Sequence, residues 1–307
     1  MTSVLPYIMI AGPTASGKSQ LAIELARRFA GAIINADSMQ LYNDLKILTA
    51  RPQPQDMRDI PHHLFGIYDA EHRASVAEWL GHAATAIDKV RSAGQLPIIV
   101  GGTGMYLQAG VRGIAPVPNV PPDVHQHCLD LYRKLGGTKF RDALACYDAD
   151  IAARLLDGDS QRLVRAMGVA MATDRPLSWW QQQPHKGALL GRVVTIAMMP
   201  PRPALYDRIN QRFDHMLMHG AIDEVSRLMT RQLDPALPLM KALGVAPITA
   251  FITGDITKDE AAVVAKRDSR RYAKRQMTWI RNNFNAQIVV EMKYSERLYE
   301  KIFSLIR

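Results

Sequence analysis

Short apolar runs alternate along this chain with longer segments whose apolar positions recur at helical spacing. The run Val4–Ile10 ends at a glycine-rich stretch, and the segment after it carries Leu21, Leu25 and Phe29 at intervals of four residues. A continuous apolar run is typical of a buried strand, and this spacing is typical of an amphipathic helix. The N-terminal part therefore predicts a strand, a loop and a helix.

The alternation continues further along the chain. Residues 32–35 and 96–100 are short apolar runs, and residues 74–93 between them have a helical pattern. Strands that alternate with helices form parallel α/β sheets, which bind ligands at the carboxyl ends of their strands. Asp37 and the glycine-rich turn 101–104 follow two of these strands. We expect both to lie at that edge of the sheet.

Four prolines interrupt the pattern in the middle of the chain. They lie within residues 114–122, and proline cannot continue a helix or a central strand. Residues 123–190 have helical patterns only, and a strand-like run resumes after them. We therefore predict a core domain in two parts, 1–115 and 191–307, and a helical insertion domain at 116–190.

Composition is that of a globular protein. The chain has 307 residues, of which 48% are hydrophobic and 22% charged, so a large core is available and a disordered chain is excluded. Cys128 and Cys146 are the only cysteines and lack metal-ligand spacing, which argues against disulfides and zinc and favours a reducing compartment. The first ten residues do not resemble a secretory signal. We expect a soluble cytoplasmic protein.

Basic residues are concentrated near the C-terminus. The chain carries 38 Lys and Arg against 29 Asp and Glu, a net charge of +9 that favours a polyanionic partner. Long helical patterns cover 202–230 and 258–283, and seven Lys or Arg lie between residues 266 and 281. At helical spacing, one side of that helix carries four of them, Arg267, Arg271, Lys274 and Arg275. Such a face can follow a phosphate backbone, and the alternative is a solvated charged surface. A second basic group at 161–165 has the same two interpretations.

The clearest motif is GPTASGKS, which matches G-x-x-x-x-G-K-[ST] in full and lies between a predicted strand and a predicted helix. In such a P-loop, backbone N–H groups wrap phosphate oxygens, Lys18 supplies a full charge and the Ser19 hydroxyl can ligate Mg²⁺. The alternative is a glycine-rich turn that binds nothing. The predicted phosphate-binding residues are Gly12, Pro13, Thr14, Ala15, Ser16, Gly17, Lys18 and Ser19.

Asp37 is the one acid at a clear strand end. NTP hydrolases usually carry an Asp after a second core strand, whereas the run 96–100 ends in glycines. Motor-type ATP hydrolysis is therefore disfavoured, and Asp37 is a candidate for metal binding or base chemistry, with a turn or N-cap role as the alternative. His62 and His63 lie in a predicted loop, where hydrogen-bonded histidines are favoured over metal ligands.

Six motifs taken together resemble the bacterial tRNA dimethylallyltransferase family. They span nearly the whole chain and are GPTASGKS, DSMQ at 37–40, PHHL at 61–64, GGTGMY at 101–106, RINQRFDHML from Arg208 and AKRQMTWIR from Ala273. The resemblance implies a P-loop NTPase-like parallel sheet core flanked by helices, with a helical insertion domain. It also implies a prenyltransferase. Such an enzyme moves a dimethylallyl group from dimethylallyl diphosphate to N6 of adenosine 37, in tRNAs that read codons beginning with U. Mg²⁺ at the P-loop is the expected cofactor, and a monomer is the default expectation.

The same resemblance implies roles for individual residues. Asp37 resembles the base, Thr14 lies near that base and the target amine, and Arg212 contacts the diphosphate. The adenosine is expected to leave its stack to reach Asp37. Contacts with tRNA are implied for Asp37, Ser38, Met39, Gln40, Thr103, His125, Gln161, Arg162, Leu163, Val164, Arg165, Lys241, Lys274, Arg275, Gln276 and Arg281. The family's R-x-x-G-Y-R motif is reduced here to residues 241–246, KALGVA, so contacts there are expected to be weaker.

Three other functions compete with this interpretation. An adenylate isopentenyltransferase would share the P-loop and Asp37 but has no need of a basic helix or a helical insertion. A P-loop small-molecule kinase would bind ATP in the same loop and is disfavoured by the missing second acid. A non-catalytic RNA-binding protein would explain the basic helix and leave the P-loop unused.

Overall fold

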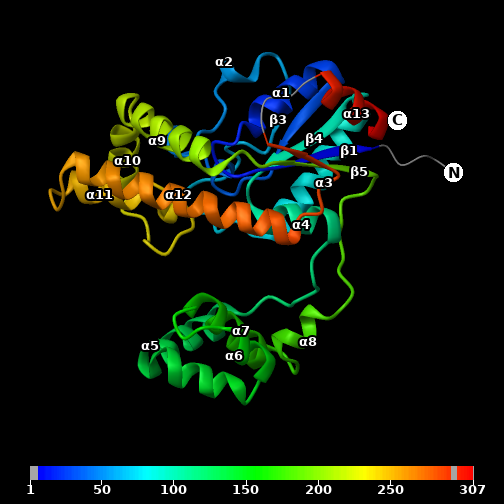
Figure 1. Ribbon diagram of the computed structural model, residues 1–307. Helices are drawn as coiled ribbons and strands as arrows, with labels where there is room; N and C mark the ends of the chain where they lie inside the picture. Colours follow the sequence, from blue (N-terminus) through cyan, green and yellow to red (C-terminus); the bar gives the residue numbers. More distant parts are fainter. Residues whose placement is uncertain (1–5, 292–295, 307) are drawn as a thin grey trace. The chain divides into compact units, whose positions relative to one another are not determined.

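A computed structural model describes residues 6–291 and 296–306 of the chain. The fold has two compact units, one built from the described parts of 1–111 and 189–307 and the other from Arg112–Ala188 (Figure 1). The second unit covers nearly the same residues as the predicted insertion at 116–190. Its limits lie four and two residues earlier.

The first unit is built on a parallel sheet. Its strand order in the described part of the chain is β3-β2-β4-β1-β5-β6, with every pair parallel. The strands are β1 (Tyr7–Ala11), β2 (Gly31–Asn35), β3 (His62–His63), β4 (Leu96–Gly101), β5 (Val193–Met198) and β6 (Ile288–Val290). The predicted parallel α/β fold is confirmed. Val4 and Leu5 of the predicted first strand lie outside the described residues, and the predicted loop at His62 is an edge strand instead.

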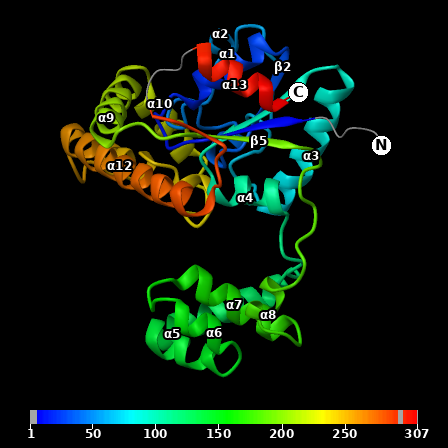
Figure 2. The ribbon, with the colours of Figure 1, turned by 45° about the vertical axis from the view of Figure 1, so that its right-hand side comes forward.

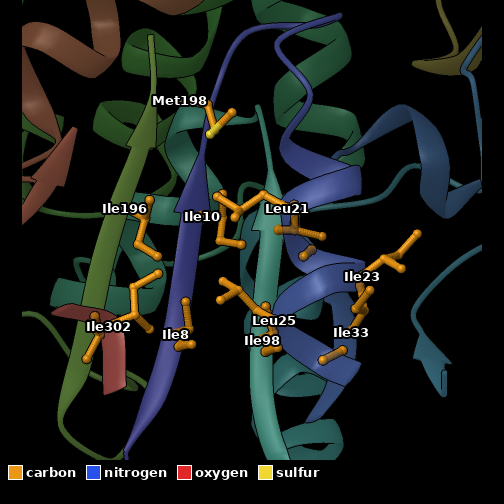
Figure 3. Packing of buried hydrophobic residues seen from close by; sticks show 14 of the residues in the cluster. Ile8, Ile10, Leu21, Ile23, Leu25, Ile33, Ile98, Ile196, Met198 and Ile302 are labelled. Carbon is orange, nitrogen blue, oxygen red and sulfur yellow. The ribbon is translucent and has the colours of Figure 1, made fainter. Parts of the chain in front are cut away.

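Alternate residues of the central strand β1 pack against different faces of the sheet. Ile8 and Ile10 contact the cluster that includes Leu21 and Leu25 of α1, as Figure 3 shows, and Ile302 of α13 belongs to the same cluster. Burying each of these side chains stabilises the fold by roughly 1.5–3 kcal/mol. This packing fixes the start of α1, and with it the loop that leads from β1, against the sheet.

The helices of the first unit surround this sheet. On the other face, the indole of Trp79 in α3 stacks on the ring of Tyr106 in α4, with centroids 4.7 Å apart. Helices α9, α10, α11 and α12 contact one another in a group beside the sheet (Figure 2). The helices are α1 (Lys18–Arg28), α2 (Pro54–Met57), α3 (Val76–Ser92), α4 (Gly104–Arg112), α9 (Arg202–Met218), α10 (Ala221–Thr230), α11 (Val245–Ile252), α12 (Lys258–Asn283) and α13 (Glu296–Ile306), with 3₁₀ turns at Met39–Leu41 and Leu239–Lys241.

Of the two long helical stretches predicted in the C-terminal part, one forms a single helix and the other is divided. Residues 258–283 form the single helix α12, which begins at a capping box between Thr257 and Glu260. The stretch 202–230 is instead divided into α9 and α10, because Gly220 adopts a left-handed φ of 99° at the start of α10. After this break α10 contacts both α9 and α11.

The second unit consists of helices around its own small core. They are α5 (Pro122–Ala145), α6 (Ala149–Arg154), α7 (Ser160–Ala172) and α8 (Leu177–Gln181). Leu163 and Val164 of α7 are buried in this core with Phe140 and Leu144. Apolar packing therefore occupies both side chains, and the tRNA contacts implied for Leu163 and Val164 stay a prediction. No described helix is both long and apolar enough to span a membrane.

Candidate active site

Three loops meet where β1, β2 and β4 end. The P-loop follows β1, Asp37 lies two residues beyond β2, and Gly102 and Thr103 follow β4. Two cavities of about 330 and 320 Å³ border the first two of these loops, and Thr14, Asp37, Thr49 and Arg212 line both. The sheet therefore brings the predicted phosphate site and the predicted base together, as the parallel topology requires.

The P-loop runs along the first cavity, which we call the phosphate cavity. Gly17 has a left-handed φ of 92°, and α1 begins directly after it without an acid in its first turn. The free N–H groups and positive dipole end of that helix favour an anion. Gly12 must lack a side chain, since a Cβ there would lie 2.6 Å from the Ser16 hydroxyl oxygen. That hydroxyl is buried and has no hydrogen-bond partner among the described residues.

Two cations converge on the phosphate cavity. Burial lowers the pKa of Lys18 to about 8, although the charge of Asp37 opposes the shift. Burial also lowers the pKa of Arg212 in α9, again against the effect of Asp37, and its guanidinium donates a hydrogen bond to the Thr14 hydroxyl. Desolvated cations are stabilised when an anion binds beside them. The cavity is therefore suited to a diphosphate.

The turn that carries Asp37 is fixed by Asn35, which no sequence motif singled out, and by Thr103, for which a tRNA contact was expected. Asn35 is fully buried, its Oδ1 accepts the Asp37 N–H at 2.8 Å, and its Nδ2 donates to the Asp37 carbonyl at 3.0 Å. The Asp37 carboxylate accepts the Met39 N–H at 3.1 Å. Thr103 accepts the Ser38 N–H at 2.9 Å, so its hydroxyl supports this turn. Asn35 could have been found from the sequence, because it is a polar residue at the end of a strand that is expected to be buried.

The second cavity, which we call the base cavity, combines apolar and polar walls. Asp37 and Arg212 lie on one side, and Phe213, Tyr272 and Arg275 add aromatic and cationic surface. Burial, reinforced by the charge of Asp37, raises the pKa of the Tyr272 phenol, which keeps it neutral. The Arg275 guanidinium lies 5.6 Å from the centroid of the Tyr272 ring. A planar base fits walls of this kind, because aromatic faces stack on it and a carboxylate accepts its amine proton.

A turn at residues 46–50 closes one side of both cavities. Glu224 of α10 is only 4% exposed, and its carboxylate accepts the N–H groups of Lys46, Ile47 and Leu48 at 2.5, 2.9 and 3.0 Å. The Gln40 side chain donates to the carbonyls of Thr49 and Ala50 at 2.9 and 3.0 Å. Gln40 was expected to contact tRNA, and here its amide nitrogen holds this turn. Glu224 was not selected from the sequence.

Gln276 has a different environment from the one expected. Its side chain is 6% exposed, lies on the inner side of α12 and bonds to the backbone of the P-loop and of Gly102. Protein covers this side chain, and the tRNA contact implied for Gln276 stays a prediction. Lys274, Arg275, Arg281 and Lys241 are exposed, as an RNA contact requires.

The remaining predicted contacts lie in the second unit. His125, Gln161 and Arg162 are exposed, and Arg162 pairs with Asp159 at 3.5 Å. Arg165 is half-buried and donates to the Pro118 carbonyl at 3.2 Å. These polar side chains form an accessible surface, and their RNA contacts stay a prediction.

His62 and Ser19 differ in how well they suit a metal ion. The Nδ1 atom of His62 lies 2.8 Å from the Ile60 carbonyl, and the described residues contain no group of three His, Cys, Asp or Glu that could hold a metal. Ser19 is exposed at the phosphate cavity beside Lys18. Mg²⁺ usually keeps several waters and shares phosphate oxygens, so a single hydroxyl suits it when a diphosphate is bound.

The comparisons with known proteins agree with this geometry. A family model described as IPP transferase matches residues 40–283, and one described as isopentenyl transferase matches residues 6–64. The tRNA dimethylallyltransferase of Hyphomonas neptunium is 49% identical over 91% of this chain and 89% of its own length. The protein of that name from Paramagnetospirillum magneticum is 42% identical over 100% of this chain and 98% of its own.

Solved structures show the same similarity. The tRNA isopentenylpyrophosphate transferase of Bacillus halodurans has a TM-score of 0.71 and 30% identity, covering 99% of this chain and 97% of its own. A eukaryotic dimethylallyltransferase acting on tRNA has a TM-score of 0.78 and 28% identity, covering 90% of this chain and 70% of its own.

Proposed function

This chain belongs to the IPP transferase family, and from that premise we propose that it transfers a dimethylallyl group from dimethylallyl diphosphate to N6 of adenosine 37 in tRNAs that read codons beginning with U. The product is N6-(dimethylallyl)adenosine. The observation that carries this assignment is the pair of adjoining cavities, because Asp37 borders both the phosphate cavity and the base cavity. Donor and acceptor can therefore meet at one carboxylate.

The P-loop stabilises the leaving group. As the allylic C–O bond breaks, negative charge grows on the diphosphate, where the loop amides, Lys18 and Arg212 lie. Charges and dipoles that are already in place lower the energy of that state without reorganisation. Water is not a reactant in this transfer, which explains why no second strand-end carboxylate is needed.

Asp37 accepts the proton. The N6 lone pair forms the new C–N bond to the allyl carbon while the C–O electrons leave with the diphosphate. The amine then becomes acidic, and one proton moves from N6 to the Asp37 carboxylate. A base of this kind typically contributes 10²–10⁴-fold to a rate. Met39 and Asn35 hold the carboxylate and its backbone in place.

The base cavity receives the adenine once it leaves the anticodon loop. Phe213 and Tyr272 offer apolar and aromatic walls, and Arg275 and Lys274 continue the positive charge onto the exposed side of α12. Phosphate contacts from such a face position the RNA, and unstacking costs a few kcal/mol that these contacts offset. We assign RNA binding to this face, a monomeric state to the chain and the cytoplasm as its location.

Mg²⁺ is the proposed cofactor, held by Ser19 together with the diphosphate. When bound it neutralises charge on the leaving group. The exposed hydroxyl of Ser19 at the head of α1 fits this role.

The decisive test incubates the purified chain with dimethylallyl diphosphate, Mg²⁺ and unmodified tRNA, and then analyses the nucleosides by mass spectrometry. We expect N6-(dimethylallyl)adenosine as the new nucleoside. Parallel reactions replace tRNA with AMP, or the donor with labelled ATP. Prenylated AMP without prenylated tRNA, or transfer of a phosphoryl group, would refute the assignment.

A further inference from the structure

We propose that Gln276 is a positioning residue through which α12 holds the P-loop in its reactive geometry. The inference rests on the proposed function and assigns to this side chain a role other than tRNA contact. Gln276 Oε1 accepts the Thr14 N–H at 2.9 Å, and its Nε2 donates to the Gly102 carbonyl at 2.9 Å. One buried amide thus joins the loops that follow β1 and β4.

The bond to Thr14 matters because of where Thr14 lies. Thr14 lines both cavities, and its hydroxyl accepts the hydrogen bond from Arg212. The bond from the Thr14 N–H to Gln276 fixes the plane of the Pro13–Thr14 peptide, and the separate bond from Arg212 holds the Thr14 hydroxyl. The Gly12 and Ser16 amides donate to the Gly101 and Pro13 carbonyls, so the N–H groups at the start of α1 are the ones left for phosphate oxygens.

The site requires glutamine in particular. A donor and an acceptor are needed at one end of the side chain, and an amide supplies both. Glutamate would place a carboxylate oxygen against the Gly102 carbonyl, and leucine would leave two buried backbone groups without partners. Space is matched as well, because a Cβ on Gly102 would lie 2.2 Å from Gln276 Nε2. Glycine at 102 and glutamine at 276 therefore depend on each other.

Gln276 and the two residues before it face opposite sides of α12. Lys274 and Arg275 are exposed immediately before it, while Gln276 points inward. One turn of helix thus presents cations for RNA on its outer side and holds the donor loop on its inner side. The two substrates are aligned by the same rigid element.

The experiment compares Gln276→Glu and Gln276→Leu with wild type and with Thr278→Ala, an exposed control on the same helix. Four quantities are measured: melting temperature, affinity for pyrophosphate with Mg²⁺, tRNA affinity by filter binding, and the single-turnover rate as a function of donor concentration. We expect both Gln276 variants to lose about 10- to 100-fold in pyrophosphate affinity and in kcat/KM for the donor, the size of one or two buried hydrogen bonds. We expect tRNA affinity to change less than about threefold, because no phosphate contact is lost.

A second route reaches the same contact. Gly102→Ala pushes on the Gln276 amide from the other side, so it is expected to show the same donor defect, and the double variant Gly102→Ala/Gln276→Leu is expected to be no worse than either single change. Unchanged pyrophosphate affinity in all of these variants would overturn the inference. So would lost tRNA affinity with an intact donor site. A wild-type chain that binds pyrophosphate but prenylates no tRNA would refute the proposed function and leave this positioning role standing.

Discussion

Glu224 offers a quantitative test of how the turn beside the two cavities is held. We expect Glu224→Gln to destabilise the fold, because it replaces one acceptor oxygen with a donor that faces backbone N–H groups. The carboxylate is buried and accepts from three consecutive amides. Hydrogen bonds to a charged group contribute about 1.5–3 kcal/mol each, so losing one or two lowers the free energy of unfolding by about 1.5–6 kcal/mol. For a unit of this size that corresponds to a melting temperature about 3–24 °C lower.

The assay is thermal unfolding followed by circular dichroism, with KM for the donor measured on the same samples. Asp223→Asn is the matched control, because Asp223 precedes Glu224 on α10, is exposed and loses the same charge. Its expected cost is only the 0.3–1 kcal/mol, roughly, of an acid at a helix N-terminus. Because the turn borders the phosphate cavity, KM should rise in Glu224→Gln and stay constant in the control. Equal melting temperatures for the two variants would refute the reasoning.

Three further predictions concern the chemistry. Asp37→Asn should slow single-turnover transfer by about 10²- to 10⁴-fold with unchanged tRNA affinity; a near-normal rate would remove Asp37 as the base. Changing Lys274 and Arg275 to glutamine should weaken tRNA binding. The slope of log affinity against log salt concentration should become shallower by about one for each lost phosphate contact. An unchanged slope would show that this face is only solvated. Burial lowers the pKa of Lys18 to about 8 in the ligand-free chain and the protonated form binds the anion, so pyrophosphate affinity should fall as the pH rises above 8. Titration calorimetry that shows the same fall in Lys18→Met would assign it to another group.

Elements with a strong local pattern could be predicted from the sequence. The strands that became β1, β2, β4 and β5 are apolar runs, and helix α12 has clear periodicity and a capping box. The edge strand at His62–His63 has no such pattern, because pairing with β2 alone defines it. The break at Gly220 was also missed, since a single glycine ends a helix only when the chain must turn left-handed there.

The residues of the candidate site also fall into two groups, those that a local pattern predicts and those that it does not. The P-loop and Asp37 are local signals, so both could be found from spacing and strand ends. The residues that position them are distant in sequence, with Gln276 bonded to Thr14 across 262 residues and Glu224 to Leu48 across 176. No local pattern predicts such a pairing, because it depends on how α10 and α12 pack against the loops.

Periodicity still carried part of this information. Gln276 and Glu224 occupy positions that the apolar spacing of their helices assigns to the core, and a polar side chain there needs a partner, since burying it unpaired costs a few kcal/mol. The opposite case is Leu163 and Val164, which motif membership assigned to RNA and helical spacing assigns to the core. The structure follows the spacing in both cases. A sequence motif indicates which residues occur together. Helical periodicity indicates which side of the helix each residue faces, and a side-chain contact with RNA depends on that side.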